Sequence, residues 1–158
     1  MSVAFTREED LEATAAELVD RPISPHPNHV TVEGLAQIEA ELAAARAAYS
    51  AAQVAGSIEA DRTAMARATR DLKYWSARRA SAQVLVQPPE GRVRFGGAFT
   101  IERADGRTQR WRIVGEDEAD PAKGTVSHVS PLARALMGKA VDDEAEVAGQ
   151  MVAVVEVE

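Results

Sequence analysis

Apolar side chains between residues 31 and 54 recur at alternating steps of three and four. This spacing predicts an α-helix that packs along one partner helix. A second seam with a seven-residue spacing follows Gly56, so the two segments predict an antiparallel helical hairpin, a coiled coil, with the stretch 55–61 at its far end. Each arm is roughly 24–28 residues, or about 36–42 Å long. The first seam comprises Leu35, Ile38, Leu42, Ala45, Tyr49 and Ala52, and the second comprises Ile58, Asp61, Met65, Ala68, Leu72, Trp75 and Ala82.

Beyond residue 87 the apolar period changes from helical to alternating. Pro88 and Pro89 interrupt the helical pattern, and a helix over 130–139 is predicted with Ser130 as its N-cap, Pro131 in the first position and Gly138 closing it. The fold class is therefore α+β: a helical hairpin followed by a small, mostly antiparallel sheet with one short helix. Strands are expected at 92–95, 98–104, 109–114 and 125–129, and as a final pair around 149–150, with a hairpin turn at 105–106.

These patterns divide the chain into three parts. Residues 1–29 form an acidic leader with prolines at 22, 25 and 27, residues 30–87 form the hairpin, and residues 88–158 form the sheet domain. The prolines predict an extended linker at the end of the leader. Residues 6–19 could form a short helix with Thr6 as N-cap, or a partly disordered arm; both interpretations stay open.

Composition narrows the classes of function. The chain has 158 residues and a formal net charge of −7, so strong direct binding to nucleic-acid phosphates is disfavoured. It has no cysteine, which excludes disulfides, thiol catalysis and zinc–thiolate sites. No apolar run reaches the roughly 18 residues of a membrane span, and the N-terminal residues lack a signal-peptide core, so we expect a cytoplasmic location.

Few residues suggest chemistry of the chain's own. His26, His29 and His128 are scattered along the sequence, and no third ligand accompanies the first two, so we predict no metal site. The acidic run at 115–120 is interpreted as a solvated loop. No catalytic residue is predicted.

Two carboxylates near the expected hairpin tip, Glu59 and Asp61, are open to two interpretations. They can simply interact with the exposed N–H groups and dipole at the start of the second helix. Alternatively, a carboxylate pair on a thin probe could hold a Mg²⁺ ion in the active site of another enzyme, since Mg²⁺ binds readily to one or two carboxylates plus phosphates.

Three stretches resemble the bacterial Gre-type transcript cleavage factors, the GreA/GreB family: "VTVEGLAQIEAEL" (30–42), "RIVGEDEAD" (112–120) and "SPLARALMGK" (130–139). The resemblance covers residues 30–158. It implies an FKBP-like C-terminal domain that docks on RNA polymerase at the rim of its secondary channel, with the hairpin entering toward the catalytic Mg²⁺. It further implies that Ser130, Pro131 and Arg134 belong to the docking surface. An FKBP-like fold does not by itself imply prolyl isomerase activity.

The tip departs from the family pattern. The cleavage factors carry Gly-Asp-x-x-Glu-Asn, whereas residues 56–61 here place Ser57 and Ala60 at the two acidic positions. Glu59 and Asp61 flank the second position, and one residue on a helix is a rotation of about 100°. Compared with the cleavage-factor form, the hairpin is also shorter by roughly two turns per arm, which shortens its reach by about 10 Å. The arrangement resembles family relatives with short or altered hairpins, which dock without stimulating cleavage.

We therefore predict a monomeric, non-enzymatic elongation regulator that binds bacterial RNA polymerase through its secondary channel. It would compete with other secondary-channel factors and need no cofactor beyond a Mg²⁺ shared with the polymerase. One alternative is a true cleavage factor that uses Glu59 and Asp61. Another is a protein-interaction adaptor unrelated to polymerase, whose acidic leader and loop contact a basic partner.

Overall fold

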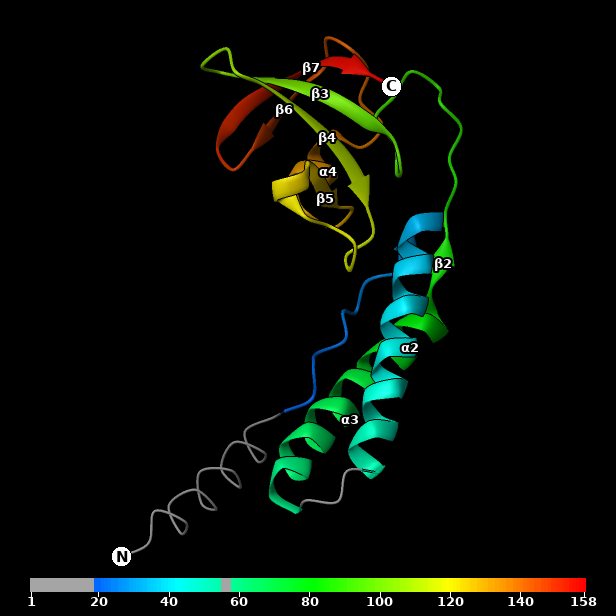
Figure 1. Ribbon diagram of the computed structural model, residues 1–158. Coiled ribbons are helices and arrows are strands. Elements are labelled where there is room, and N and C mark those ends of the chain that lie inside the picture. Colours follow the sequence, from blue (N-terminus) through cyan, green and yellow to red (C-terminus); the bar gives the residue numbers. More distant parts are fainter. Residues whose placement is uncertain (1–18, 55–57) are drawn as a thin grey trace, which may run out of the picture. The chain divides into compact units, whose positions relative to one another are not determined.

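The computed structural model describes residues 19–54 and 58–158, except for the side chains of residues 58–61 (Figure 1). Contacts divide the chain into two compact units. The hairpin unit contains residues 37–81 together with the chain up to Pro25, and the sheet unit contains residues 26–36 and 82–158. These borders differ from the expected ones because residues 26–36 belong with the sheet.

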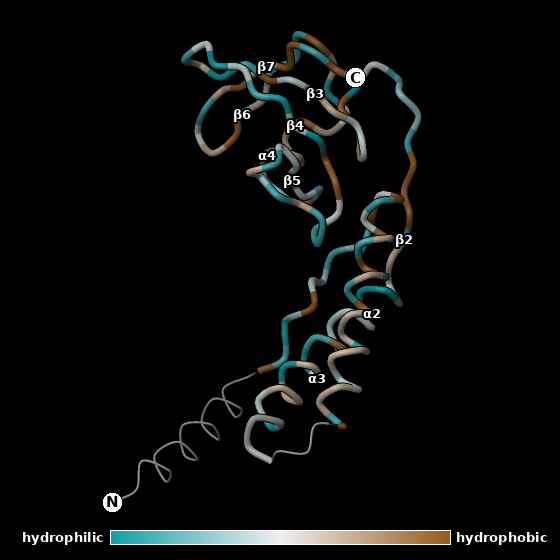
Figure 2. The backbone as a smooth tube through the Cα atoms, viewed as in Figure 1, coloured by the Kyte–Doolittle hydropathy of each residue, from teal (hydrophilic) through white to brown (hydrophobic). Residues whose placement is uncertain are grey.

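Two antiparallel helices form the hairpin: α2 (Val32–Val54) and α3 (Ile58–Ser81) (Figure 1). The expected seam is confirmed, since its members among the described side chains are buried or half-buried. An ion pair of 3.1 Å joins Arg79 Nε to Glu39 across the two helices. The seam members with the least exposure are Ile38, Leu42, Ala45 and Ala52 on α2 and Ala68 and Trp75 on α3. Figure 2 shows much of α2 in pale colours, because alanine, its commonest residue, is only weakly hydrophobic.

One short strand pair was not expected from the sequence. β1 (His29–Val30) pairs in parallel with β2 (Gln83–Val84). The amide of Gln83 donates to the Asn28 carbonyl at 2.9 Å, and that of Leu85 donates to the Val30 carbonyl at 3.0 Å. These bonds draw the chain into an extended course directly after α3, so the helix ends at Ser81 and not at the prolines.

The sheet unit is built on five strands in the order β5-β4-β3-β7-β6. Neighbouring strands are antiparallel except β4 and β5, which are parallel. The β3–β4 turn lies where the sequence placed it, and Gly106 there has φ +82°. The strands are β3 (Ala98–Arg103), β4 (Thr108–Val114), β5 (Thr125–Ser127), β6 (Glu144–Val147) and β7 (Gln150–Val157).

Two expected strand details were wrong. Residues 92–95 form no regular strand: Arg92 and Phe95 make isolated bridges to Ala140 and Ile113, and Gly96, at φ +77°, turns the chain away. In the last hairpin the turn lies one residue earlier than expected, because Ala148 and Gly149 both take a left-handed conformation and Val147 pairs with Gln150.

The core of the sheet unit lies between the sheet and the short helix α4 (Pro131–Leu136). Leu132, Ala133 and Leu136 of α4 join buried residues from the strands in one cluster. The expected α+β architecture, a helical hairpin followed by a largely antiparallel sheet with one short helix, is thus confirmed. Within the described ranges, no helix has both the length and the apolar character that crossing a membrane requires.

Candidate functional site

The three residues expected to form a docking surface lie together at the start of α4. Ser130 has extended backbone angles, and its hydroxyl accepts a hydrogen bond from the Ala133 amide at 3.2 Å. Pro131 follows in the first helical position, where the absence of an N–H costs nothing. The sequence prediction of this cap is confirmed, and it fixes where the helix begins.

The burial of α4 decides which side chains it presents outward. Leu132, Ala133 and Leu136 face the core, so Pro131 and Arg134 are exposed. Met137, one further step of three along the chain, is also exposed, with 38% of its surface accessible. Met137 directly follows α4, which ends at Leu136. We call Pro131, Arg134 and Met137 the α4 stripe; sequence reasoning found its first two members and missed Met137.

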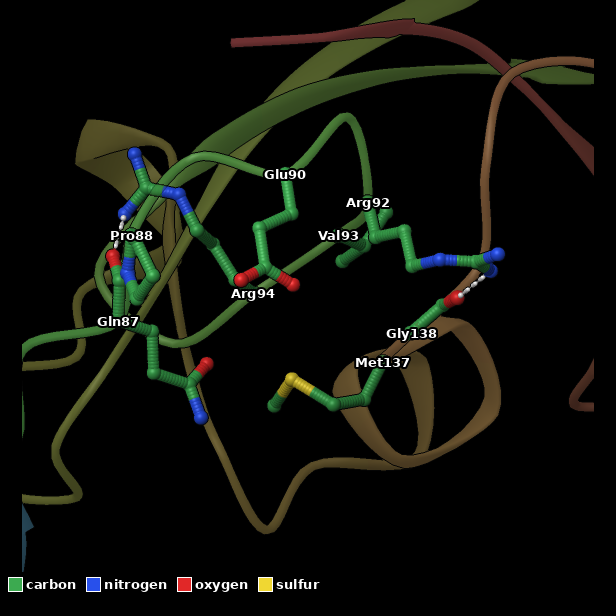
Figure 3. A pocket seen from close by; sticks show the side chains of 8 residues that line it. All are labelled: Gln87, Pro88, Glu90, Arg92, Val93, Arg94, Met137 and Gly138. Carbon is green, nitrogen blue, oxygen red and sulfur yellow. Dashed lines mark hydrogen bonds between the residues drawn. The ribbon is translucent and has the colours of Figure 1, made fainter.

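A hollow of about 380 Å³ adjoins the end of this stripe (Figure 3). Arg92 donates to the Gly138 carbonyl at 3.0 Å, and Arg94 donates to the Gln87 carbonyl at 3.1 Å. These bonds hold both guanidinium groups at the wall of the hollow. Its lining offers no serine, cysteine or histidine and thus no nucleophile–base pair. The lining residues are Gln87, Pro88, Glu90, Arg92, Val93, Arg94, Met137 and Gly138.

The acidic run 115–120 is not a solvated loop, so that interpretation was wrong. Glu118 accepts hydrogen bonds from the Thr31 hydroxyl at 2.5 Å, the Thr31 amide at 3.1 Å and the Gly115 amide at 3.3 Å. Thr31 in turn caps α2 by accepting from the Gly34 amide at 3.0 Å. Asp120 caps the short 3₁₀ helix η1 (Pro121–Lys123). Most of the run is half-buried, and two of its carboxylates, those of Glu118 and Asp120, accept hydrogen bonds from backbone N–H groups.

We call Thr31 and Glu118 the cap clamp. It works only because two glycines leave room. A Cβ at Gly34 would overlap the Glu118 carboxylate, and a Cβ at Gly115 would lie 2.6 Å from the His29 carbonyl. An isolated glycine inside a helical pattern, such as Gly34, often has a packing reason. That signal could have marked the first turn of α2 as closely packed, but it does not identify Glu118 as the partner.

The first turn of α2 is also favourable for negative charge. The pKa of Glu33 is lowered, first by a hydrogen bond from its own backbone N–H at the helix start. Arg112, whose guanidinium lies 3.7 Å away, and the Thr31 side chain lower it further. The Arg112 guanidinium also donates to the Gly96 carbonyl at 2.9 Å, which fixes its direction.

The structure brings together two histidines that the sequence left scattered. The ring centroids of His29 and His128 are 5.4 Å apart, and Phe95 meets both rings edge-on at 6.2 and 5.8 Å. His29 belongs to β1 and His128 directly follows β5, so this contact joins segments 99 positions apart in the numbering. Over residues 19–54 and 58–158, no group of three His, Cys, Asp or Glu side chains is placed to hold a metal ion.

The second predicted site concerns the hairpin tip. Glu59 and Asp61 lie in the first turn of α3, but their side chains fall outside the described part of the structure, as do residues 55–57. The magnesium-holding interpretation of this pair therefore stays a prediction.

Comparison with known proteins places the chain in a family. Residues 88–158 match the family model described as "Transcription elongation factor, GreA/GreB, C-term". The transcription elongation factor GreB of Xanthomonas axonopodis pv. citri is 37% identical over 132 residues, which cover 73% of this chain and 79% of that protein. The GreB factor of Haemophilus ducreyi is 44% identical over 80 residues, covering 49% of each chain. The chain belongs to the GreA/GreB family of transcription elongation factors.

The lengths of the matched relatives and the solved structures add two facts to this comparison. The chain spans about half the length of several curated relatives that it matches, among them the Haemophilus ducreyi factor at 49%. Among solved structures, GreA factor homolog 1 of Thermus thermophilus aligns with 84% of this chain and 99% of its own, at 18% identity and a TM-score of 0.40.

Proposed function

We propose that this protein binds bacterial RNA polymerase through the α4 stripe and regulates transcript elongation from the secondary channel, without strongly stimulating transcript cleavage. The family match over residues 88–158 carries the proposal, because the whole α4 stripe lies inside it. On this account the protein is not an enzyme but acts on one.

The geometry of the stripe supports a protein contact. Pro131, Arg134 and Met137 expose a rigid apolar ring, a guanidinium and a thioether at and directly after α4. Arginine and methionine are enriched at protein–protein interfaces. Met137 also borders the hollow, so stripe and hollow form one continuous surface. The net charge of −7 disfavours nucleic-acid phosphates as the primary target.

The absence of strong cleavage stimulation is supported by the tip sequence. Ser57 and Ala60 occupy the positions that are acidic in the cleavage-factor pattern. The helices of 23 and 24 residues are about 35 Å long, at the short end of the expected range. A docked protein with such a hairpin would occupy the channel and exclude a cleavage factor from it.

Binding to purified core polymerase tests the docking surface. Arg134→Glu reverses the charge in the middle of the stripe, and Arg107→Glu makes the same change in the β3–β4 turn, where the side chain is 81% exposed. We expect Arg134→Glu to weaken binding by about tenfold or more, equivalent to about 1.4 kcal/mol, and Arg107→Glu to leave it unchanged. Equal affinities for both variants would remove α4 from the interface. No binding by the parent protein would favour the adaptor alternative.

A further inference from the structure

The alanines of the hairpin leave an unfilled groove. Between α2 and α3 lies a space of about 480 Å³ whose walls are mainly methyl groups. Ala48, Ala51 and Ala64 on its walls are exposed, although they carry no polar atoms in their side chains. Two charged residues, Arg67 and Asp71, complete it at one end. The lining residues are Ala45, Ala48, Ala51, Ala52, Ala64, Arg67, Ala68 and Asp71.

Asp20 and Arg21, near the start of the described chain, contact side chains of α3 beside this groove. Arg21 donates to Asp71, a groove residue, at 3.4 Å, and its guanidinium lies over the Tyr74 ring at 3.8 Å from the centroid. Asp20 pairs with Lys73 at 2.5 Å. The described chain therefore begins beside the groove.

The contacts also indicate the direction in which the chain travels. Residue 29 pairs with residue 83, whereas residue 21 contacts residues 71 and 74. Between residue 29 and residues 20–21 the chain thus runs toward the N-terminal end of α3. Arg67 and Ala64, which line the groove, lie further in the same direction along α3.

The leader sequence has the charge and pattern that the groove requires. Leu11, Ala15 and Leu18 are spaced four and three apart, which places them on one face of a helix. Residues 6–18 would span about 20 Å as a helix, more than the roughly 10 Å between Ala64 and Asp71. The leader contains six acidic residues and one basic residue up to position 20, whereas α3 contains six basic and three acidic residues.

We propose that residues 6–18 dock in this groove as a third helix, with Leu11 and Leu18 on the alanines and the acidic residues toward the basic side chains of α3. The leader would then cover one face of the hairpin. A docked helix adds about 10 Å of width. The docking does not rest on the proposed function.

Thiol protection in the full-length protein tests the docking, since the native chain has no cysteine. Ala48→Cys places a single thiol in the groove, and Ser50→Cys places one about 200° around the same helix as a matched control. Each is combined with Leu11→Ser and Leu18→Ser, and the rate of alkylation is measured. We expect the leader substitutions to raise the rate at position 48 about tenfold and to leave position 50 unchanged. Equal rates at position 48 with and without them would overturn the proposal.

Two further measurements test whether the leader or another molecule occupies the groove, and whether charge attraction holds the leader there. Protection at position 48 that rises with protein concentration would identify a second copy of the chain as the occupant and overturn the assignment. Arg67→Glu should reduce the protection several-fold if the acidic leader is attracted as proposed, and unchanged protection would remove the electrostatic argument. Because no polymerase is present, failure of this test leaves the proposed function intact, and failure of polymerase binding leaves this result intact.

Discussion

Replacing Gly34 with alanine should destabilise the sheet unit, although the same change in an ordinary helix stabilises it. Alanine is favoured over glycine by about 1 kcal/mol in a helix interior. At this position, however, the new Cβ would overlap the Glu118 carboxylate, which must leave the cap clamp. Its two hydrogen bonds from Thr31 are lost. Hydrogen bonds to a charged acceptor contribute about 1.5–3 kcal/mol each.

The balance between these terms gives the expected sign. The half-buried carboxylate regains water when displaced, so the low end of the range applies to each lost bond. A loss of about 3 kcal/mol against a gain of about 1 kcal/mol leaves a net destabilisation of about 2 kcal/mol. In a Glu118→Ala background nothing remains to be displaced, so Gly34→Ala should stabilise by about 0.5–1 kcal/mol. The substitution should therefore change sign between the two backgrounds.

Urea unfolding followed by tryptophan fluorescence measures the effect. A Trp75→Phe background leaves Trp111, on β4, as the reporter of the sheet unit. All four members of the double-mutant cycle are compared by their free energies of unfolding. If Gly34→Ala stabilises the protein equally in both backgrounds, Glu118 does not form the clamp described here.

Three other substitutions test separate parts of the structure. Ser130→Ala removes the acceptor for the Ala133 amide and should lower the stability of the sheet unit by about 1 kcal/mol in urea; an unchanged midpoint would contradict the cap. Ile38→Ala removes most of a side chain that is 1% exposed and should lower the stability of the hairpin by about 2–5 kcal/mol. The helical circular dichroism should then disappear at a lower temperature on heating, and a destabilisation below about 1 kcal/mol would contradict the burial of Ile38. Arg110 lowers the pKa of Glu158 by donating to it, so this pair stabilises the fold above the ordinary carboxyl range and loses that contribution as the pH falls through the lowered pKa. Arg110→Gln should make the urea midpoint less dependent on pH below about 4.3, and an unaltered pH profile would show that the pair does not contribute.

Local patterns predicted much of this fold. The a/d spacing placed Ile38 and Trp75 in the hairpin seam because burial on one side of a helix imposes a period on the sequence. Ser130 and Pro131 located the start of α4 because capping depends on residues only three positions apart. The exposure of Arg134 follows from the same helical period.

The contacts that sequence reasoning missed join distant segments. Glu118 and Thr31 are 87 positions apart, and nothing local distinguishes a carboxylate that caps a remote helix from one in solvent. The burial of Arg78 to 1% exposure was likewise not expected, since Arg78 adjoins a second arginine, Arg79, in the last turn of α3. Such positions depend on which elements the topology brings together, not on the period within one element.

Transcript cleavage by backtracked polymerase complexes tests the central claim most directly. Cleavage is measured with this protein alone, and then with a Gre cleavage factor in the presence and absence of excess protein. The account predicts no stimulation by the protein alone and suppression of the cleavage that the added factor stimulates, with Arg134→Glu relieving the suppression. Strong stimulation by the protein alone would contradict the account and show that Glu59 and Asp61 reach the polymerase's metal ion.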